Sequence, residues 1–174
     1  MPNTKNKPSA PAVKKVPFAV SEAYKSIRTN LISKLSKEQK KVIAISSSNA
    51  SEGKSTTAIN IAISLSQLGK KVLLVDTDAH RPSITAKLGL KAENGIMDVI
   101  AGFCEANYAA ISYNSLLDIL TIGHIPQNPT EVFASASFEE CIKEFAVNYD
   151  FVIIDTPPVN VLSDALVIAQ KCDG

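Results

Sequence analysis

The chain has 174 residues, of which 45% are apolar, and this is enough to bury one substantial hydrophobic core. Its formal net charge of +1 excludes a global basic field for binding nucleic acid. No apolar run approaches the roughly 20 residues of a membrane-spanning helix, and the N-terminus lacks the apolar region of a signal peptide. We therefore expect one domain, which needs a partner chain for any work at a membrane.

The first 20 residues differ in charge from the rest of the chain. They contain four lysines, four prolines and no acidic residue, so they carry +4 while residues 21–174 carry −3. This composition predicts a disordered basic tail over residues 1–20. A solvated linker and a weakly membrane-binding segment both fit it. Ser21 is then expected to cap a helix that runs to about Lys37.

The next segment carries the strongest functional signal. A hydrophobic strand over 42–45 leads into S-S-S-N-A-S-E-G-K-S-T at 46–56, and a helix follows from Lys54 to Leu68, ended by Gly69. A strand, a tight turn and a helix N-terminus direct backbone N–H groups and the positive end of a helix dipole into one concavity, which suits a polyphosphate. The alternative is a serine- and glycine-rich turn that only caps a helix.

The loop matches the phosphate-binding pattern G-x-x-x-x-G-K-[ST], except that Ser48 stands at the position of the first glycine. Lys54 can reach the β- and γ-phosphates, and Ser55 can offer its hydroxyl to Mg²⁺. The predicted nucleotide contacts are Ala50, Ser51, Glu52, Gly53, Lys54, Ser55 and Thr56.

Two further strands end in acidic residues. A strand over 72–75 is followed by Asp76 and Asp78, which in an extended strand point to the same side. A second strand over 151–154 is followed by Asp155. Ligands of open parallel sheets bind beyond the carboxyl ends of the strands, so Lys54, Asp76, Asp78 and Asp155 are expected to converge there.

The remaining pattern alternates short helices and strands. Helices are expected near 83–88, 96–101, 128–146 and from about Ser163, and a strand is expected over 117–122. The series predicts an α/β fold with a mostly parallel sheet flanked by helices. Cys104, Cys141 and Cys172 include no C-x-x-C pair, which indicates a reduced, cytoplasmic setting without a disulfide framework or zinc site.

Five segments, in order along the chain, resemble one family. They are S-E-A-Y-K-S-I-R-T-N at 21–30, S-E-G-K-S-T at 51–56, V-D-T-D-A-H-R-P at 75–82, G-H-I-P-Q-N-P-T-E at 123–131 and D-F-V-I-I-D-T-P-P at 150–158. From Ser21 onward the chain is similar to the cytoplasmic catalytic domain of the bacterial tyrosine kinases that control capsular and exopolysaccharide synthesis.

The resemblance implies a three-layer P-loop NTPase fold, like that of septum-site and partitioning ATPases. It also implies ATP- and Mg²⁺-dependent phosphorylation of tyrosine, including self-phosphorylation. Lys54 would neutralise phosphate charge, and Ser55, Asp78 and Asp155 would hold Mg²⁺. Asp76 would orient or deprotonate the attacking phenol. The alternative for Asp76 is that it caps a helix.

The same resemblance implies partners. These are a transmembrane chain-length regulator as activator, protein substrates that bear tyrosine, a tyrosine phosphatase and further copies of the chain in a ring, but no nucleic acid. The domain would then work in the cytoplasm, at the inner face of the membrane through its partner. The family motif for ring assembly falls on Glu22, Lys25 and Arg28, with lysine in place of an arginine. Their spacing alone indicates a solvated helix face with an ion pair.

Two departures from the family pattern lead to expectations. Ala50-Ser51 replaces the usual Pro-Gly, so the turn is expected to adopt ordinary backbone angles, with reduced nucleotide affinity. The chain stops at Gly174, where the family begins another strand and continues to a tyrosine-rich tail. The domain over 21–174 is thus expected to be truncated at its C-terminus, with an exposed sheet edge.

Two other functions stay open. An ATPase switch of the septum-site or chromosome-partitioning type shares these motifs, but such proteins commonly carry an extra lysine early in the loop, where this chain has Asn49. A non-catalytic, kinase-like scaffold is the second.

Overall fold

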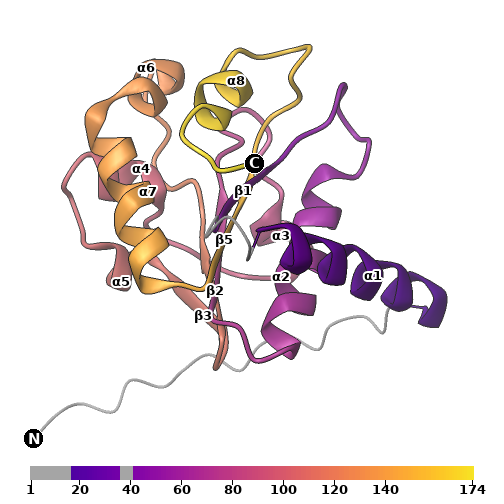
Figure 1. The fold of residues 1–174 in the computed structure, drawn as a ribbon. Helices are drawn as coiled ribbons and strands as arrows, with labels where there is room; N and C mark the ends of the chain where they lie inside the picture. The colour runs from indigo at the N-terminus through magenta and orange to yellow at the C-terminus, as the bar shows by residue number, and fades with distance from the viewer. Residues whose placement is uncertain (1–16, 36–40) are drawn as a thin grey trace, which may run out of the picture.

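The computed structural model describes residues 17–35 and 41–174, and it places a five-stranded sheet between two layers of helices (Figure 1). The strands are β1 (Val42–Ile45), β2 (Val72–Asp76), β3 (Ile111–Asn114), β4 (Leu117–Leu120) and β5 (Phe151–Asp155). Their spatial order is β1-β5-β2-β4-β3, with only β3 antiparallel to its neighbour. The predicted, mostly parallel α/β sheet is confirmed, and β3 is an addition.

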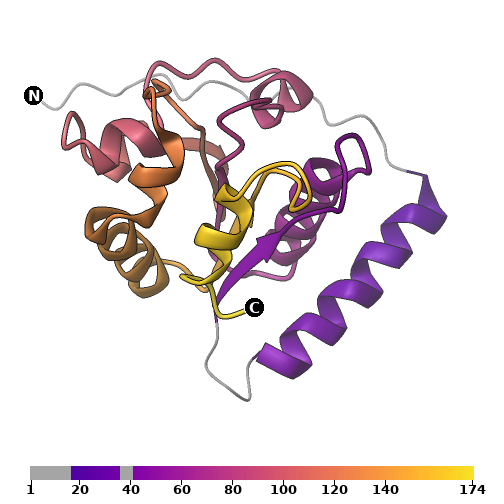
Figure 2. The same cartoon turned by 90° about the horizontal axis from the view of Figure 1, so that it is seen from above.

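Helices cover both faces of this sheet (Figures 1 and 2). One face packs against α1 (Phe18–Leu35), α2 (Lys54–Gln67) and α3 (Ile84–Leu88). The other packs against α4 (Ile96–Ile100), α5 (Ala106–Ala109), α6 (Pro129–Ala134), α7 (Ala136–Asn148) and α8 (Asp164–Ala169). None of these helices, in the part of the chain that the structure describes, is both long and apolar enough to cross a bilayer.

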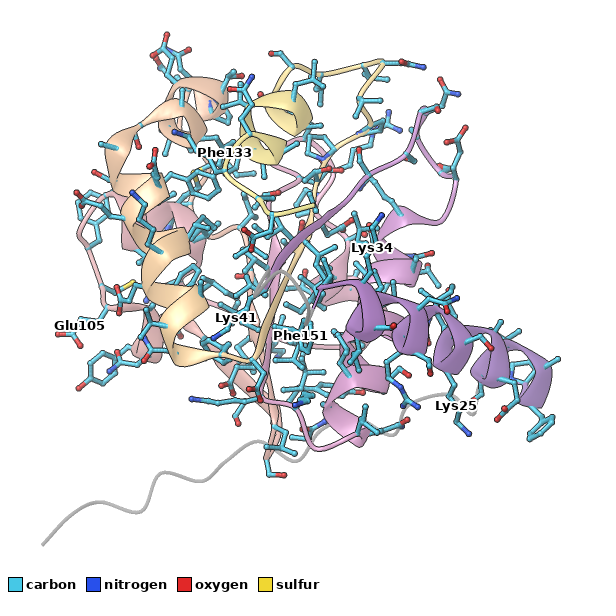
Figure 3. All side chains as sticks on the ribbon, in the orientation of Figure 1. Lys25, Lys34, Lys41, Glu105, Phe133 and Phe151 are labelled. Atoms are coloured by element: carbon cyan, nitrogen blue, oxygen red, sulfur yellow. The ribbon has the colours of Figure 1, made fainter. Side chains whose placement is uncertain are left out.

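The strand sequences explain the two layers. Side chains alternate between the faces of a strand, so Val72 and Leu74 join the core under α2, whereas Leu73 and Val75 join the core under α7. Every residue of β2 and β5 is buried, as expected for central strands covered on both sides. Phe151 and Phe133 mark the two cores in Figure 3.

Two helix predictions need correction. Helix α1 begins at Phe18, before Ser21, because the N–H of Ser21 donates to the carbonyl of Pro17 and extends the helical turn backward. Residues 18–20 of the expected tail are therefore helical, while residues 1–16 and the predicted helix end at Lys37 lie outside the described residues.

The single helix expected over 128–146 is two helices. Ser135 has extended backbone angles (φ −69°, ψ 157°), and its Oγ accepts a hydrogen bond from the N–H of Phe138 at 3.2 Å. Serine is a favoured N-cap, and here it ends α6 and begins α7. The apolar periodicity continues across Ser135, so the sequence pattern did not reveal the break between the two helices.

The outer edge of β1 is partly covered by the last two residues. The N–H of Asp173 donates to the carbonyl of Val42 at 2.8 Å, and the N–H of Ala44 donates to the carbonyl of Gly174 at 2.9 Å. Hydrogen bonding at these positions satisfies part of the edge that was expected to be exposed.

A close backbone crossing joins the loop after β4 to the start of α4. A Cβ atom on Gly95 would lie 2.2 Å from the carbonyl oxygen of Thr121, and one on Gly123 would lie 2.1 Å from Oδ2 of Asp98. The buried Asp98 carboxylate accepts hydrogen bonds from the N–H groups of Gly95 and His124 at 2.8 and 3.2 Å. Glycine at both crossing positions therefore fixes the loop that carries His124.

Gly123→Ala tests this crossing, with Gly102→Ala as the matched control. Both glycines have φ of 76°, but a Cβ on Gly102 meets nothing within 4 Å. The left-handed backbone thus costs both variants the same, and only Gly123→Ala adds a clash. We expect Gly123→Ala to lower the free energy of unfolding by about 1–3 kcal/mol more than the control, measured by urea denaturation. Equal losses would contradict the tight crossing.

Candidate active site

The loop between β1 and α2 has the backbone of a phosphate cradle. Gly53, immediately before α2, has φ of 94°, and Ser51 has φ of 67°. The side chain of Glu52 accepts hydrogen bonds from the backbone N–H and the side-chain amide of Asn49 at 3.1 and 3.0 Å. These bonds lower the pKa of Glu52 and hold the loop closed on itself.

The expectation of ordinary backbone angles in this turn is wrong. Ser51 stands where the family has glycine, and it adopts the left-handed conformation that glycine would take. This conformation costs a side chain roughly 1–2 kcal/mol. The turn between a strand and a helix N-terminus imposes this conformation, so serine at this position adds strain to the loop.

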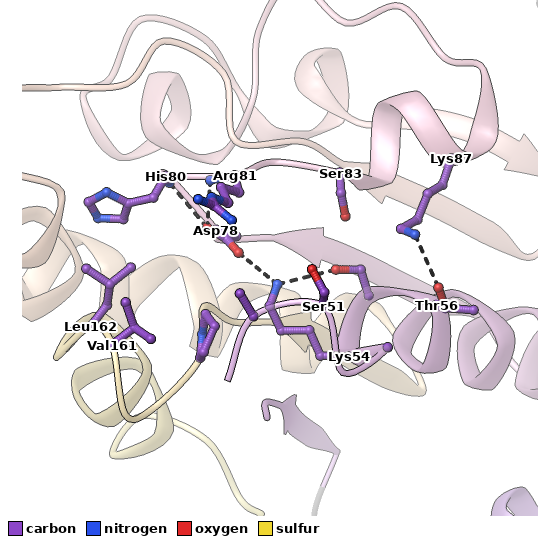
Figure 4. Close-up of a pocket in the computed structure, with 14 residues that line it drawn as sticks. Ser51, Lys54, Thr56, Asp78, His80, Arg81, Ser83, Lys87, Val161 and Leu162 are labelled. Carbon is purple, nitrogen blue, oxygen red and sulfur yellow. Dashed lines mark hydrogen bonds and ion pairs between the residues drawn. The ribbon is translucent and has the colours of Figure 1, made fainter. Parts of the chain in front are cut away.

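A cavity of about 530 Å³ opens above this loop (Figure 4). Cationic side chains from three segments line it, together with the N-terminal turn of α2 and one apolar wall. The lining residues include Lys54, Arg81 and Lys87 as cations, and Pro158, Val161 and Leu162 as the apolar wall. Positive charge, backbone N–H groups and an apolar surface in one cavity suit a nucleotide with its phosphates on the loop.

Lys54 links the carboxyl ends of two strands. Its Nζ lies 2.7 Å from Oδ2 of Asp78 and 3.8 Å from Oδ1 of Asp155, and it donates to the hydroxyl of Ser55 at 3.3 Å. Asp76 and Asp155 are direct partners in the register of β2 and β5. Parallel pairing therefore brings the predicted site residues to one edge of the sheet.

The surroundings of Asp155 favour the binding of a cation. Its side chain is fully buried, and neither carboxylate oxygen has a hydrogen-bond donor among the described residues. Burial raises its pKa to about 7, although the nearby Ser55 and Lys54 act in the opposite direction. A buried carboxylate without donors, next to a hydroxyl and a second carboxylate, fits an oxygen-liganded divalent cation such as Mg²⁺.

Asp76 and Asp78 face different neighbours, which corrects the expectation that they point to the same side. Strand β2 ends at Asp76, so Asp78 lies beyond the extended backbone on which that expectation rested. Asp78 lines the cavity above the phosphate loop and accepts from the N–H groups of His80 and Arg81 at 3.2 and 2.9 Å. The carboxylate of Asp76 instead lines a separate small cavity.

The hydrogen bonds of Asp76 match the alternative that it caps a helix. Its Oδ2 accepts from the N–H groups of Ser83 and Ile84 at the start of α3, both at 3.2 Å, and its Oδ1 accepts from the N–H of Asp78 at 3.1 Å. Burial nevertheless raises its pKa to about 6, against the effect of these bonds. Asp76 thus stabilises the start of α3, and any role as a general base would be in addition to this structural role.

Several residues of this region were not singled out as site residues from the sequence. His80, Arg81 and Lys87 line the cavity above the phosphate loop, and Nε2 of His80 lies 3.3 Å from Oδ2 of the buried Asp164. The hydroxyl of Thr130 donates to the same carboxylate and so joins α6 to α8. Each contact spans 30 or more positions in sequence, so local patterns did not indicate it.

The chain matches known proteins over most of its length. A family model described as an AAA domain matches residues 40–172. Tyrosine-protein kinase YwqD of Bacillus subtilis is 39% identical over 155 residues, covering 88% of this chain and 65% of that protein. Tyrosine-protein kinase CpsD of Streptococcus pneumoniae serotype 4 is 35% identical over 167 residues, covering 94% of this chain and 73% of that protein. The chain belongs to the bacterial tyrosine-protein kinase family.

The fold agrees with this membership. The kinase domain of Escherichia coli tyrosine kinase ETK superposes with a TM-score of 0.87 at 26% identity, covering 98% of this chain and 68% of that chain. The predicted P-loop NTPase fold is thus confirmed, and with it a nucleotide-binding architecture. The chain spans about two thirds of the length of the curated relatives described above.

The three residues expected to assemble a ring lie on α1 with different contacts. Glu22 and Lys25 form an ion pair at 2.8 Å, and both side chains are about half exposed. Nη1 of Arg28 donates instead to the carbonyl of Ser64 on α2 at 2.9 Å. In this kinase-family domain Arg28 therefore holds α1 against the body, while Glu22 and Lys25 stay accessible.

The pKa of Asp155 predicts how stability depends on pH. An unfolded aspartate titrates near 3.9, but the folded state raises this pKa to about 7. Between these values the folded chain binds more protons than the unfolded chain. Without a divalent cation, the free energy of unfolding therefore falls as pH rises from about 4 to about 7. Asp76, with its pKa raised to about 6, acts in the same direction.

Asp155→Asn should remove most of this fall, which for one group amounts to at most about 4 kcal/mol. Urea unfolding of both proteins at several pH values in the presence of EDTA measures it. At pH 8, added Mg²⁺ should raise the stability of the wild-type protein and leave the variant unchanged. The same pH dependence in both proteins would show that other groups cause the fall.

Proposed function

We propose that this domain is a protein-tyrosine kinase that uses ATP and Mg²⁺, phosphorylates its own chain and other proteins, and acts in capsular or exopolysaccharide synthesis. The observation that carries the proposal is Lys54 at the floor of the cavity, between the carboxylates of Asp78 and Asp155. This is the set of charges that transfer of a phosphoryl group requires. The named activity of the relatives supports the same reaction.

The loop and Lys54 would bind the phosphates. The first turn of α2 and residues 50, 51 and 53–56 line the cavity, and the ammonium of Lys54 would move from Asp78 toward the β- and γ-phosphates. Ser55, Asp78 and Asp155 would hold Mg²⁺, which neutralises charge on those phosphates. Arg81 and Lys87 line the same cavity and would add positive charge near the transferring group.

Asp76 remains the candidate to orient the acceptor phenol. The phenol of tyrosine titrates near pH 10, so it is a weak nucleophile at neutral pH and needs positioning. The pKa of about 6 would suit a base at neutral pH, whereas the three backbone hydrogen bonds limit the lone pairs that remain. We therefore assign to Asp76 the role of orienting the acceptor phenol.

The two alternative functions have less support. The side-chain amide of Asn49 is bonded to Glu52, so the loop lacks the extra cation that is common in septum-site and partitioning ATPases. The relatives described above are named tyrosine-protein kinases. A scaffold without catalysis would not need a buried carboxylate such as Asp155, which lies 3.8 Å from Nζ of Lys54 and has no hydrogen-bond donor among the described residues.

Phosphotyrosine formation with ATP, Mg²⁺, a tyrosine-bearing peptide and an activator segment tests the proposal, with ADP release recorded in parallel. We expect Lys54→Ala to reduce transfer at least about 100-fold, because no other side chain takes its place between Asp78 and Asp155. Asp76→Asn should keep nucleotide binding and lose transfer. Lys34→Ala, which changes an exposed lysine of α1 outside the cavity, is the control.

Each result separates the candidate functions. Phosphotyrosine that depends on Lys54 supports the kinase. ADP release without phosphotyrosine favours the ATPase switch, and neither product favours the scaffold.

We further propose that this domain works with a transmembrane activator at the inner face of the membrane and assembles with copies of itself through α1. Protein substrates with tyrosine and a tyrosine phosphatase would complete the cycle. Helix α1 lies along one side of the body, where its exposed face is accessible to a second copy (Figure 2). Exposed Phe18, one helical turn before Glu22 on the same face of α1, supports an interface there.

Glu22→Ala tests the ring more cleanly than a change of Arg28, which would also loosen α1 from α2. Loss of Glu22 should lower the mass measured by light scattering in the presence of nucleotide and Mg²⁺. Lys34→Ala removes an exposed charge of the same helix outside the three-residue motif, so it should retain the larger mass. If both variants keep the wild-type mass, the stripe is a solvated helix face.

A further inference from the structure

A fixed pair of side chains, Asp98 and His124, lies outside the nucleotide cavity. Nδ1 of His124 is 2.7 Å from Oδ1 of Asp98, while Oδ2 of Asp98 accepts from the N–H groups of His124 and Gly95. Asp98 is buried, whereas the His124 side chain is 77% exposed. The glycine crossing behind the pair leaves the loop no room to shift. The imidazole is thus held through Nδ1, which leaves Nε2 for a second hydrogen bond.

The position of this pair places it beside Asp76. Strands β2 and β4 are parallel neighbours, with Val75 opposite Leu120, so the loop after β4 emerges next to the end of β2. Asp76 and His124 line one cavity of about 190 Å³, together with Pro82, Thr85 and Thr121. His124 also lines an apolar groove of about 540 Å³ that includes Phe103 and Ile125. The imidazole therefore stands between a small polar cavity and an apolar surface.

Hydrogen bonding separates Asp76 from His124 as the group that can receive a ligand in this cavity, which the exposed Glu93 also lines. The carboxylate of Asp76 already accepts three backbone N–H groups. Although burial opposes it, hydrogen bonds from Gly95 and His124 lower the pKa of Asp98, so this carboxylate is ionised at neutral pH and accepts the proton of Nδ1. In the neutral imidazole Nε2 then carries the lone pair. It is an acceptor that a hydroxyl group can use.

We propose that His124 positions the acceptor tyrosine, whose phenolic hydroxyl donates a hydrogen bond to Nε2 in the cavity shared with Asp76. This inference rests on the proposed kinase function and deepens it. An aromatic ring with one terminal hydroxyl suits the site, since the apolar groove adjoins the polar cavity at His124. Asp98 acts as a positioning residue through the imidazole. The nucleotide would occupy the cavity that Asp78 lines, beyond the end of β2.

His124→Asn is the decisive variant. The asparagine amide can occupy the place of Nδ1 and keep the bond to Asp98, but nothing replaces Nε2. Loss of one hydrogen bond to the hydroxyl should lower kcat/KM for a tyrosine peptide about tenfold, mainly through KM for the peptide. Nucleotide affinity, measured with a fluorescent ATP analogue, reports on the other cavity, and urea denaturation reports on the fold. A merely structural role would change stability and leave KM for the peptide unchanged.

Asp98→Asn is the second variant. Its amide oxygen can still accept from Gly95, but its NH₂ group would face Nδ1 and favour the tautomer with the proton on Nε2. The phenol would then lose its acceptor, so kcat/KM for the peptide should fall as in His124→Asn. If the folded His124→Asn variant has wild-type kinetics, this inference is wrong and the proposed function is unaffected. Absence of phosphotyrosine from the wild-type protein would overturn the proposed function, and this inference with it.

Discussion

The ammonium of Lys54 is the interaction on which the rest of the site depends. Parallel pairing sets Asp76 opposite Asp155, and the turn after β2 adds Asp78, so three carboxylates meet where little solvent reaches them. Such groups repel one another and lose hydration on burial. Backbone N–H groups satisfy Asp76, and Lys54 neutralises Asp78 at 2.7 Å. Asp155, 3.8 Å from the same ammonium, is left without a donor. The site thus keeps a deficit of positive charge that a bound cation would supply.

The same region concentrates features that reduce stability. Ser51 holds a left-handed backbone, and Asp155 and Asp76 are buried with raised pKa values. Strain of this kind persists only where the surroundings fix the conformation. Here the fully buried strands β2 and β5 provide a rigid edge, and α2 fixes the end of the loop. The buried sheet therefore stabilises the fold, whereas the destabilising groups lie at the ends of its strands, where ligands of parallel sheets bind.

The sequence predicted those parts of the fold that depend on local patterns. Strands β1, β2 and β5 appeared as short apolar runs, and the residues after them indicated the site, because the topology of a parallel sheet brings strand ends together. Three other features depended on contacts between distant segments and were missed. These are the cap at Ser135 that divides α6 from α7, the hydrogen bond of Arg28 to Ser64, and the pair of Asp98 and His124. The left-handed Ser51 was missed because glycine, not serine, usually marks that conformation.

The end of β2 divides the site into two sides, and this division explains why two acidic residues so close in sequence do different work. Asp76 is the last residue of the strand, and its side chain turns toward α3 and the loop after β4. Asp78 lies beyond the strand and faces Lys54 and the phosphate loop. In the proposed reaction a phosphoryl group would pass from a nucleotide in the cavity of Asp78 to a hydroxyl in the cavity of Asp76. One residue of this turn lines each cavity, and the hydrogen bond from the N–H of Asp78 to Oδ1 of Asp76 helps to hold the Asp76 carboxylate on its side. A change at Asp76 would therefore act on the acceptor side, while the contacts of Asp78 with Lys54 and with the N–H groups of His80 and Arg81 hold the nucleotide side in place.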